Sequence, residues 1–230
     1  MRAFVLSIAT AVLLTPLVAS AANGEPRKAL TKDGQRTARS VVLKRADLGA
    51  GFTSLARGKD DDLPKGARCS ALDESDLTVT GDAVSPDFRF AQGPAFVTIG
   101  STAQVYRTLR DANTSWRRGT ASRTTTCLSD IVRLSAAPGQ KITVVSAKRV
   151  PFPAISPKTT AYRLVVTIGL AGTQQIRAYV DAVILQHGRI QTGLLFTSVG
   201  RPVEEVDRVA LAAVVAARMA KATRPRGPVA

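Results

Sequence analysis

The chain contains a single histidine, His187, so chemistry that needs an imidazole depends on this residue. It lies between two apolar, strand-like runs, "YVDAVILQ" and "RIQTGLLF", and is followed by Gly188. A two-residue hairpin loop needs positive φ, which Gly adopts freely and His tolerates better than most residues. The chain also lacks a Gly-x-Ser-x-Gly nucleophile elbow and a His-Glu-x-x-His zinc motif. We therefore predict that His187 is a turn residue and expect no catalytic residue, no metal site and no cofactor.

Acidic residues offer a second kind of chemistry, because two carboxylates on either side of a glycosidic bond can hydrolyse it. Asp181 stands inside an otherwise apolar segment, and Asp82 and Asp87 flank another strand-like segment. The sequence does not fix the distances between these carboxylates, so a secreted hydrolase with paired carboxylates remains an alternative function. The Asp60–Asp62 run lacks the alternating acidic spacing of a calcium loop, and we predict a solvated loop there.

Arginines close to Asp181 suggest a binding site. Arg177 precedes Asp181 by four positions, so both side chains lie on one face of a strand, and Arg163 is in the matching register of the neighbouring strand. Guanidinium groups match carboxylates and phosphates in geometry. Arg163, Arg177 and Asp181 are therefore our candidate ligand-binding residues. A structural ion pair at the sheet surface explains the same pattern and is the reading that we favour.

The start of the chain is typical of a secretory signal peptide. A short basic start precedes an apolar stretch, and Ala19-Ser20-Ala21 supplies the small residues of a cleavage site. We expect residues 1–21 to be removed, and the mature chain to be secreted, or associated with the cell wall, without a transmembrane anchor. Cys69 and Cys127 are the two cysteines of the chain, and in an exported protein they predict a disulfide.

The charge of the chain indicates anionic partners. Lysine and arginine number 32 against 17 acidic residues, a formal net charge of +15. Outside the cytoplasm, the anions that such a field would attract are cell-wall polymers, phospholipids and glycolipids, and we expect no nucleic acid. The alternative, that the charge serves only solubility, stays open.

Periodicity predicts a single α/β (α+β) domain between a disordered lead-in at 22–37 and a disordered basic tail at 221–230. Its first element is a short helix that ends before Gly49, and strands begin at residue 77. A helix follows, with a capping-box pattern at Ser101 and Gln104 and a stop at Gly119, and a second helix begins near Leu128. The last third predicts an antiparallel meander and a closing helix, from Pro202 to Met219, that docks on the sheet.

The order of several motifs resembles the secreted sensor-like domains of actinobacteria. The motifs are "VVLKRADLGAGF", "STAQVYRTL", "CLSDIV", "TTAYRLVVTI", "AYVDAVILQHGRI" and "LLFTSVGRPVEEVDRVALAAVVAARM". They are similar to the extracellular sensor domain of PknH-type kinases and to LpqN-type envelope lipoproteins. This resemblance covers residues 38–220 and implies an α/β (α+β) sandwich of the PsbP-like kind, with a central antiparallel sheet flanked by helices and a cleft for an envelope ligand. The chain lacks a kinase domain and a lipid-attachment cysteine, so a free or wall-associated role fits better than transmembrane signalling.

Together these observations predict an exported, non-enzymatic binding or sensor-like module of the cell envelope. The expected ligand is an anionic or amphipathic envelope component. A structural or partner-binding envelope protein without a small-molecule site remains a second alternative to the hydrolase.

Overall fold

A computed structural model describes residues 24–56, 69, 72–92, 95–134, 136, 140–170 and 175–224. The predicted signal peptide, the Asp60–Asp62 run and residues 225–230 lie outside this part of the chain. The strands are β1 (Arg27–Lys28), β2 (Thr53–Leu55), β3 (Thr78–Val84), β4 (Asp87–Gln92), β5 (Ala95–Tyr106), β6 (Gln140–Val150), β7 (Lys158–Leu170), β8 (Gln175–His187) and β9 (Ile190–Val199). The helices are α1 (Lys32–Val41), α2 (Leu109–Gly119), α3 (Thr124–Leu134) and α4 (Glu205–Thr223), with a short 3-10 helix at Arg45–Asp47.

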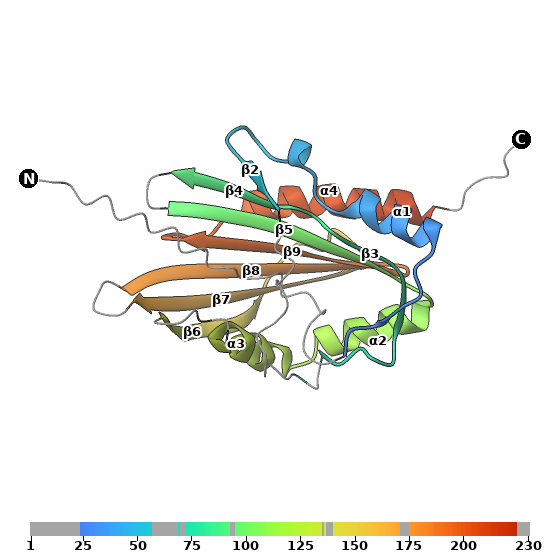
Figure 1. Ribbon diagram of the computed structural model, residues 1–230, viewed down its shortest axis with the longest axis horizontal. Helices are drawn as coiled ribbons and strands as arrows, with labels where there is room; N and C mark the ends of the chain where they lie inside the picture. Colours follow the sequence, from blue (N-terminus) through green and yellow to red (C-terminus); the bar gives the residue numbers. More distant parts are fainter. Residues whose placement is uncertain are drawn as a thin grey trace, which may run out of the picture.

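The strands form one twisted sheet, with α1 and α4 on one face and α2 and α3 on the other (Figure 1). The strand order is β1-β3-β5-β9-β8-β7-β6, and β4 pairs with both β5 and β2. β1 and β3 are parallel, whereas the other pairs are antiparallel. The predicted α+β sandwich is confirmed, and so is the meander, since β6 to β9 pair in consecutive order.

Strict alternation along the long strands fills two cores. On β7, Leu164 and Val166 face α3 and pack with Ile131 and Val132 of that helix. The residues of opposite parity face α4, whose buried stripe consists of Arg208, Ala212, Val215, Ala216 and Met219. Val183 and Leu185 of β8 belong to this second core and are completely buried. The closing helix therefore docks on the sheet as its wide apolar surface predicts.

The predicted lead-in at residues 22–37 is wrong for the described part, which starts at Gly24. Arg27 N donates to Leu77 O and Ala29 N donates to Val79 O, so this segment forms the edge strand β1. Helix α1 then begins at Lys32, because the Thr31 side chain accepts a hydrogen bond from Gly34 N and caps it. The ordered fold therefore begins earlier than the polar composition suggests.

The predicted helix over residues 101–119 is wrong in its first part. β5 continues through Ser101 and Gln104 to Tyr106, and α2 begins at Leu109 with Thr108 as its cap. The Thr108 hydroxyl accepts from Asp111 N at 3.0 Å, so Thr108 makes the N-terminal capping bond that was predicted for Ser101. Ser101 instead accepts from Leu43 N inside the core, a long-range contact that local spacing does not reveal.

The bounds of the closing helix also differ from those predicted. α4 begins at Glu205, three residues after Pro202, and continues to Thr223 into the predicted tail. The fold thus extends from Arg27 to Thr223, beyond the predicted limits of 38 and 220.

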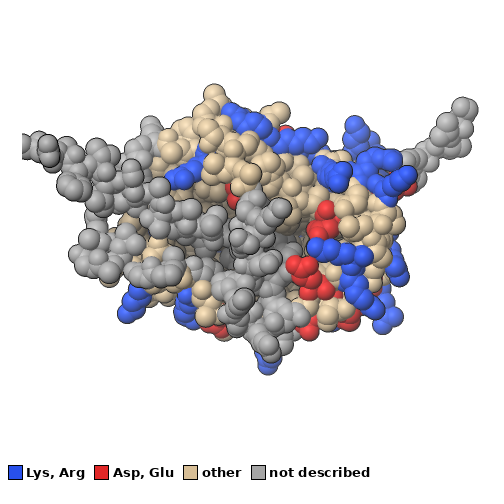
Figure 2. Space-filling model, viewed as in Figure 1, with Lys and Arg blue, Asp and Glu red and all other residues tan. Residues whose placement is uncertain are grey.

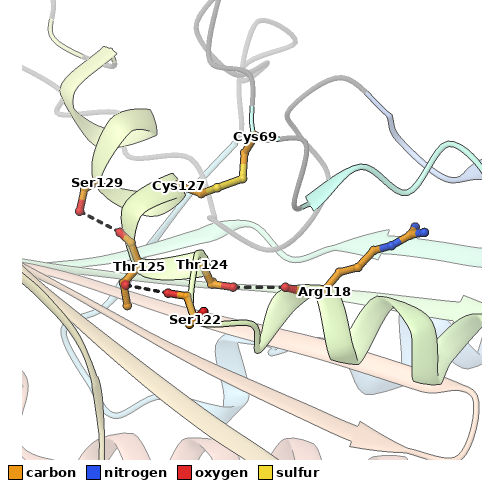
Figure 3. Close-up of a disulfide and its surroundings, with 7 residues drawn as sticks. All are labelled: Cys69, Arg118, Ser122, Thr124, Thr125, Cys127 and Ser129. Atoms are coloured by element: carbon orange, nitrogen blue, oxygen red, sulfur yellow. Dashed lines mark hydrogen bonds between the residues drawn. A yellow bond between two sulfur atoms is a disulfide. The ribbon is translucent and has the colours of Figure 1, made fainter.

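The predicted disulfide between Cys69 and Cys127 is present, with 5.6 Å between the Cα atoms (Figure 3). Cys127 lies in α3, so the bond ties this helix to the segment that precedes β3. Thr124 Oγ1, at the start of α3, donates to Arg118 O at 3.2 Å and links α3 to the end of α2. Closing a loop of this size stabilises a fold by roughly 4 kcal/mol in the chain-entropy estimate.

A buried acid lies close to this disulfide-linked segment. Glu74 is only 1 % exposed, and its Oε2 atom lies 2.9 Å from the Tyr106 hydroxyl oxygen. The same hydroxyl lies 2.8 Å from Gln104 Oε1 and 2.8 Å from Ser115 Oγ. A hydroxyl has one proton to donate, and Gln104 Oε1 and an ionised carboxylate can only accept. A protonated Glu74 donates to Tyr106, which then donates to Gln104, so the geometry favours the neutral acid.

Burial raises the pKa of Glu74 to about 7, from its ordinary value of 4.5. The folded protein therefore holds this proton more tightly than the unfolded chain does. The stabilisation is complete below about pH 4.5 and is lost as the pH rises to about 7. The loss amounts to roughly 3 to 4 kcal/mol, since a tenfold change in proton affinity corresponds to ~1.4 kcal/mol.

Glu74→Gln is expected to remove this pH dependence, because the amide stays neutral at every pH. Urea unfolding at pH 5 and pH 8 measures it: the variant gains stability relative to the unmodified protein at the higher pH. Glu205→Gln, which removes an exposed carboxylate from α4, is the matched control. An unchanged difference between the two pH values in Glu74→Gln would contradict the assignment.

Candidate ligand-binding face

Asp181 lies under α4 and is 1 % exposed. Arg163, directly opposite on β7, donates to it twice, from Nε at 2.7 Å and from Nη2 at 3.1 Å. Arg208 of α4, 5 % exposed, places its Nη1 atom 3.5 Å from Asp181 Oδ1. One buried carboxylate therefore joins two strands and a helix. This ion-pair cluster lies under α4 and not at the sheet surface, where it was predicted from the sequence.

Arg177, the third predicted site residue, does not join this cluster. It lies on the same face of β8, four positions before Asp181, but it is exposed and forms no ion pair with any described residue. The register explains the difference: Arg163 is directly opposite Asp181, whereas Arg177 is opposite Thr167. The guanidinium of Arg177 is thus available to a ligand, whereas two nitrogens of Arg163 are already engaged.

Helix α4 covers the sheet only as far as Asp181. Exposure rises along this face of β8, from buried Asp181 through half-buried Tyr179 to exposed Arg177. Across the strands, Val97 is opposite Ser198, Ser198 is opposite Tyr179, and Tyr179 is opposite Val165. Residues directly opposite each other in a sheet share a face. These four residues, on β5, β9, β8 and β7, therefore lie on one open face of the sheet, which continues beyond the start of α4. We call this face the floor.

A pocket of about 130 Å³ lies at one side of this floor, between β4, β5 and the start of α4. Its lining is mainly apolar and consists of Phe90, Ala95, Phe96, Val97, Val199, Arg201, Pro202, Val203, Glu204 and Asp207. For comparison, an engineered apolar cavity of roughly 150 Å³ binds benzene. The pocket therefore has room for a short apolar group.

The turn after β9 brings a second arginine, Arg201, to the pocket. Gly200 has a φ of +91°, a conformation that suits glycine, and its N–H donates to Arg177 O at 3.1 Å. Ser198 Oγ donates to Arg201 O at 2.7 Å and closes the turn. Arg201, which lines the pocket and is exposed, therefore follows a residue bonded to the backbone of Arg177.

The acidic residues considered for hydrolysis do not converge on Asp181. Asp82 lies on β3, where Lys28 Nζ is 3.1 Å from its Oδ2, and Asp87 is the first residue of β4. In both cases β5 and β9 lie between that strand and β8, a separation of about 14 Å at ~4.8 Å per strand. Paired catalytic carboxylates lie ~5 to 10 Å apart. Neither Asp82 nor Asp87 therefore forms such a pair with Asp181.

His187 is the last residue of β8 and is paired with Ile190 of β9. The two-residue loop is Gly188-Arg189, one position later than predicted, and Gly188 has a φ of +56°. The glycine supplies the positive φ, so the histidine need not adopt it. The prediction that His187 is a turn residue is therefore wrong by one position, because the histidine ends β8 and the loop begins after it.

Arg208, Arg201 and the pocket were not predicted from the sequence. Arg208 looks like an ordinary charge near the start of an apolar helix, and its partner Asp181 is 27 positions away. A signal did exist, because an arginine in register with the apolar stripe of α4 must be buried and paired. The pocket has no such signal, since its lining comes from three separate segments.

No protein-family model, curated protein or solved structure matches the chain. The resemblance to actinobacterial sensor-like domains therefore stays a prediction. Within the described residues, no helix combines the length and the apolar character that crossing a membrane requires.

Asp181→Asn is expected to destabilise the protein by about 3 kcal/mol, because it leaves the buried Arg208 without a counter-charge. Urea unfolding at neutral pH measures the change. Arg177→Gln is the control on the same strand face and is expected to leave stability within about 0.5 kcal/mol of the unmodified protein. Equal stability of the two variants would show that the Asp181 cluster does not hold α4 to the sheet.

Proposed function

We propose that the protein is an exported, non-enzymatic binding protein for an amphipathic ligand that carries an anionic group. The apolar part of the ligand occupies the pocket between β4, β5 and α4. The anionic group binds to Arg177 and Arg201 on the strand side of the opening. The disulfide between Cys69 and Cys127 supports a place outside the cytoplasm.

The observation that carries this proposal is the continuity of the pocket with exposed arginines. Val97 lines the pocket and belongs to the floor of Ser198 and Tyr179, next to Arg177 on β8. A ligand that lies along this floor contacts apolar groups at one end and a guanidinium at the other. Most small-molecule sites have this composition, an apolar wall with a few polar groups that fix the orientation.

Charges at the opening decide where the anionic group binds. Glu204 and Asp207 border the pocket on the side of α4, whereas Arg177 and Arg201 lie on the strand side. An anion is repelled by the first pair and attracted by the second. The proposed orientation therefore points the anionic group away from α4.

Decyl phosphate, kept below its micelle concentration, is a suitable probe, and isothermal titration calorimetry measures its affinity. The double variant Arg177→Ala/Arg201→Ala is expected to bind roughly tenfold more weakly or worse, because a hydrogen bond to a charged group contributes ~1.5–3 kcal/mol. Val203→Trp, which fills the pocket, is expected to weaken binding by a similar factor.

The matched control is Arg123→Ala/Arg133→Ala, which removes two exposed charges from the region of α3. It is expected to keep the affinity of the unmodified protein. The same loss in both double variants would mean that net charge attracts the probe, and unchanged affinity in Val203→Trp would exclude the pocket.

A further inference from the structure

At the end of the sheet opposite Arg177, three parts of the chain meet. Arg189, in the β8–β9 hairpin, donates from Nη1 to Tyr106 O at 3.2 Å and to Arg107 O at 3.0 Å, just before α2. A Cβ atom at Gly188 would lie 3.6 Å from Thr223 Cγ2 at the end of α4. The hairpin thus contacts the residues before α2 and the last turn of α4.

The start of α1 lies at the same level of the sheet. Gly81 is opposite Val105, and Val105 is opposite Ile190, the first residue after the hairpin. Gly34, in the first turn of α1, packs on the backbone at Gly81. Lys32 therefore belongs to this end as well.

Cations gather at this end of the molecule (Figure 2). Six of them are exposed and form no ion pair with a described residue: Lys32, Arg107, Arg110, Arg189, Lys221 and Arg224. Asp33 is paired with Arg36 at 3.2 Å and does not offset these charges, whereas Asp111 offsets one of them. We name these six residues the basic end.

Two leucines are exposed among these cations. Leu109 is 53 % exposed between Arg107 and Arg110, and Leu30 is 47 % exposed two residues before Lys32. A soluble polyanion has no apolar region in which a leucine side chain could be buried. A bilayer offers both a layer of phosphates and, just below it, an apolar region.

We propose that the basic end docks on the surface of an anionic phospholipid bilayer. The six cations bind headgroup phosphates, and Leu109 reaches into the interface below them. Arg177 and His187 lie at opposite ends of β8, ten residues or about 33 Å apart at ~3.3 Å per residue. The docked protein therefore holds the pocket away from the bilayer, and the bilayer contact does not depend on the function proposed for the pocket.

Vesicle sedimentation at physiological ionic strength tests this with the mature chain, which lacks the apolar signal peptide predicted at residues 1–21. Vesicles of phosphatidylcholine mixed with phosphatidylglycerol are compared with vesicles of phosphatidylcholine alone, and the protein is expected to bind only the mixture. Arg110→Gln/Lys221→Gln/Arg224→Gln is expected to lower the partition coefficient on the order of a hundredfold. That is roughly fivefold for each cation, the ratio that corresponds to ~1 kcal/mol per Lys or Arg near an anionic surface.

The control variant, Arg123→Gln/Arg133→Gln/Lys141→Gln, removes the same net charge from α3, β6 and the turn before α3. It is expected to bind the mixed vesicles at least tenfold more strongly than the first triple variant does. Equal partition of the two triple variants would overturn the proposal, because net charge alone would then account for binding.

Leu109→Ser separates a bilayer from a soluble polyanion. The substitution is expected to lower partition to the mixed vesicles several-fold while leaving binding to inorganic polyphosphate unchanged. Unchanged vesicle binding in Leu109→Ser, together with polyphosphate binding that depends on the basic end, would replace the bilayer by a soluble polyanion and overturn the proposal.

Discussion

The buried carboxylate of Asp181 is the constraint on which the candidate site depends. A charge without solvent is tolerated only when it is paired, and Asp181 is paired from two sides, by Arg163 of the neighbouring strand and by Arg208 of the closing helix. Because Arg208 is in the first turn of α4, the ion pair sets the position at which this helix begins to cover the sheet. That position lies well inside the length of β8. The helix therefore leaves uncovered the part of the strand that carries Tyr179 and Arg177, and this is where the floor and the pocket lie.

This arrangement gives the two ends of the sheet different properties. At one end, strands extend beyond their helical cover and offer an apolar pocket beside exposed arginines. At the other end, hairpin and helix termini close the sandwich and present the basic end, whose cations form no ion pair with a described residue and surround the exposed Leu109. The long strands β7 and β8 connect both ends rigidly, because each is paired on both edges. A ligand at the first end and a surface at the second can therefore be bound at the same time.

Most of the fold could be predicted from periodicity, because alternation along β7 and β8 and the wide apolar surface of α4 have direct structural consequences. The errors occur where a tertiary contact overrides a local pattern. Ser101 and Gln104 read as a helix cap but lie in β5, since Ser101 accepts a hydrogen bond from Leu43 in the core. The polar segment from Gly24 is ordered because it pairs with β3. Of the site, the face that carries Arg163, Arg177 and Asp181 could be predicted. Which arginines pair with Asp181 could not, because the choice depends on register between strands and on Arg208 of a helix far along the chain.

The proposed binding mode can be observed by intermolecular NOEs between decyl phosphate and the isotope-labelled protein in solution. It predicts contacts from the methylene protons of the probe to the side chains of Phe90, Val97 and Val203, together with shifts of the guanidinium signals of Arg177 and Arg201. Contacts confined to other parts of the surface, or an absence of contacts at concentrations that produce heat on mixing, would contradict it.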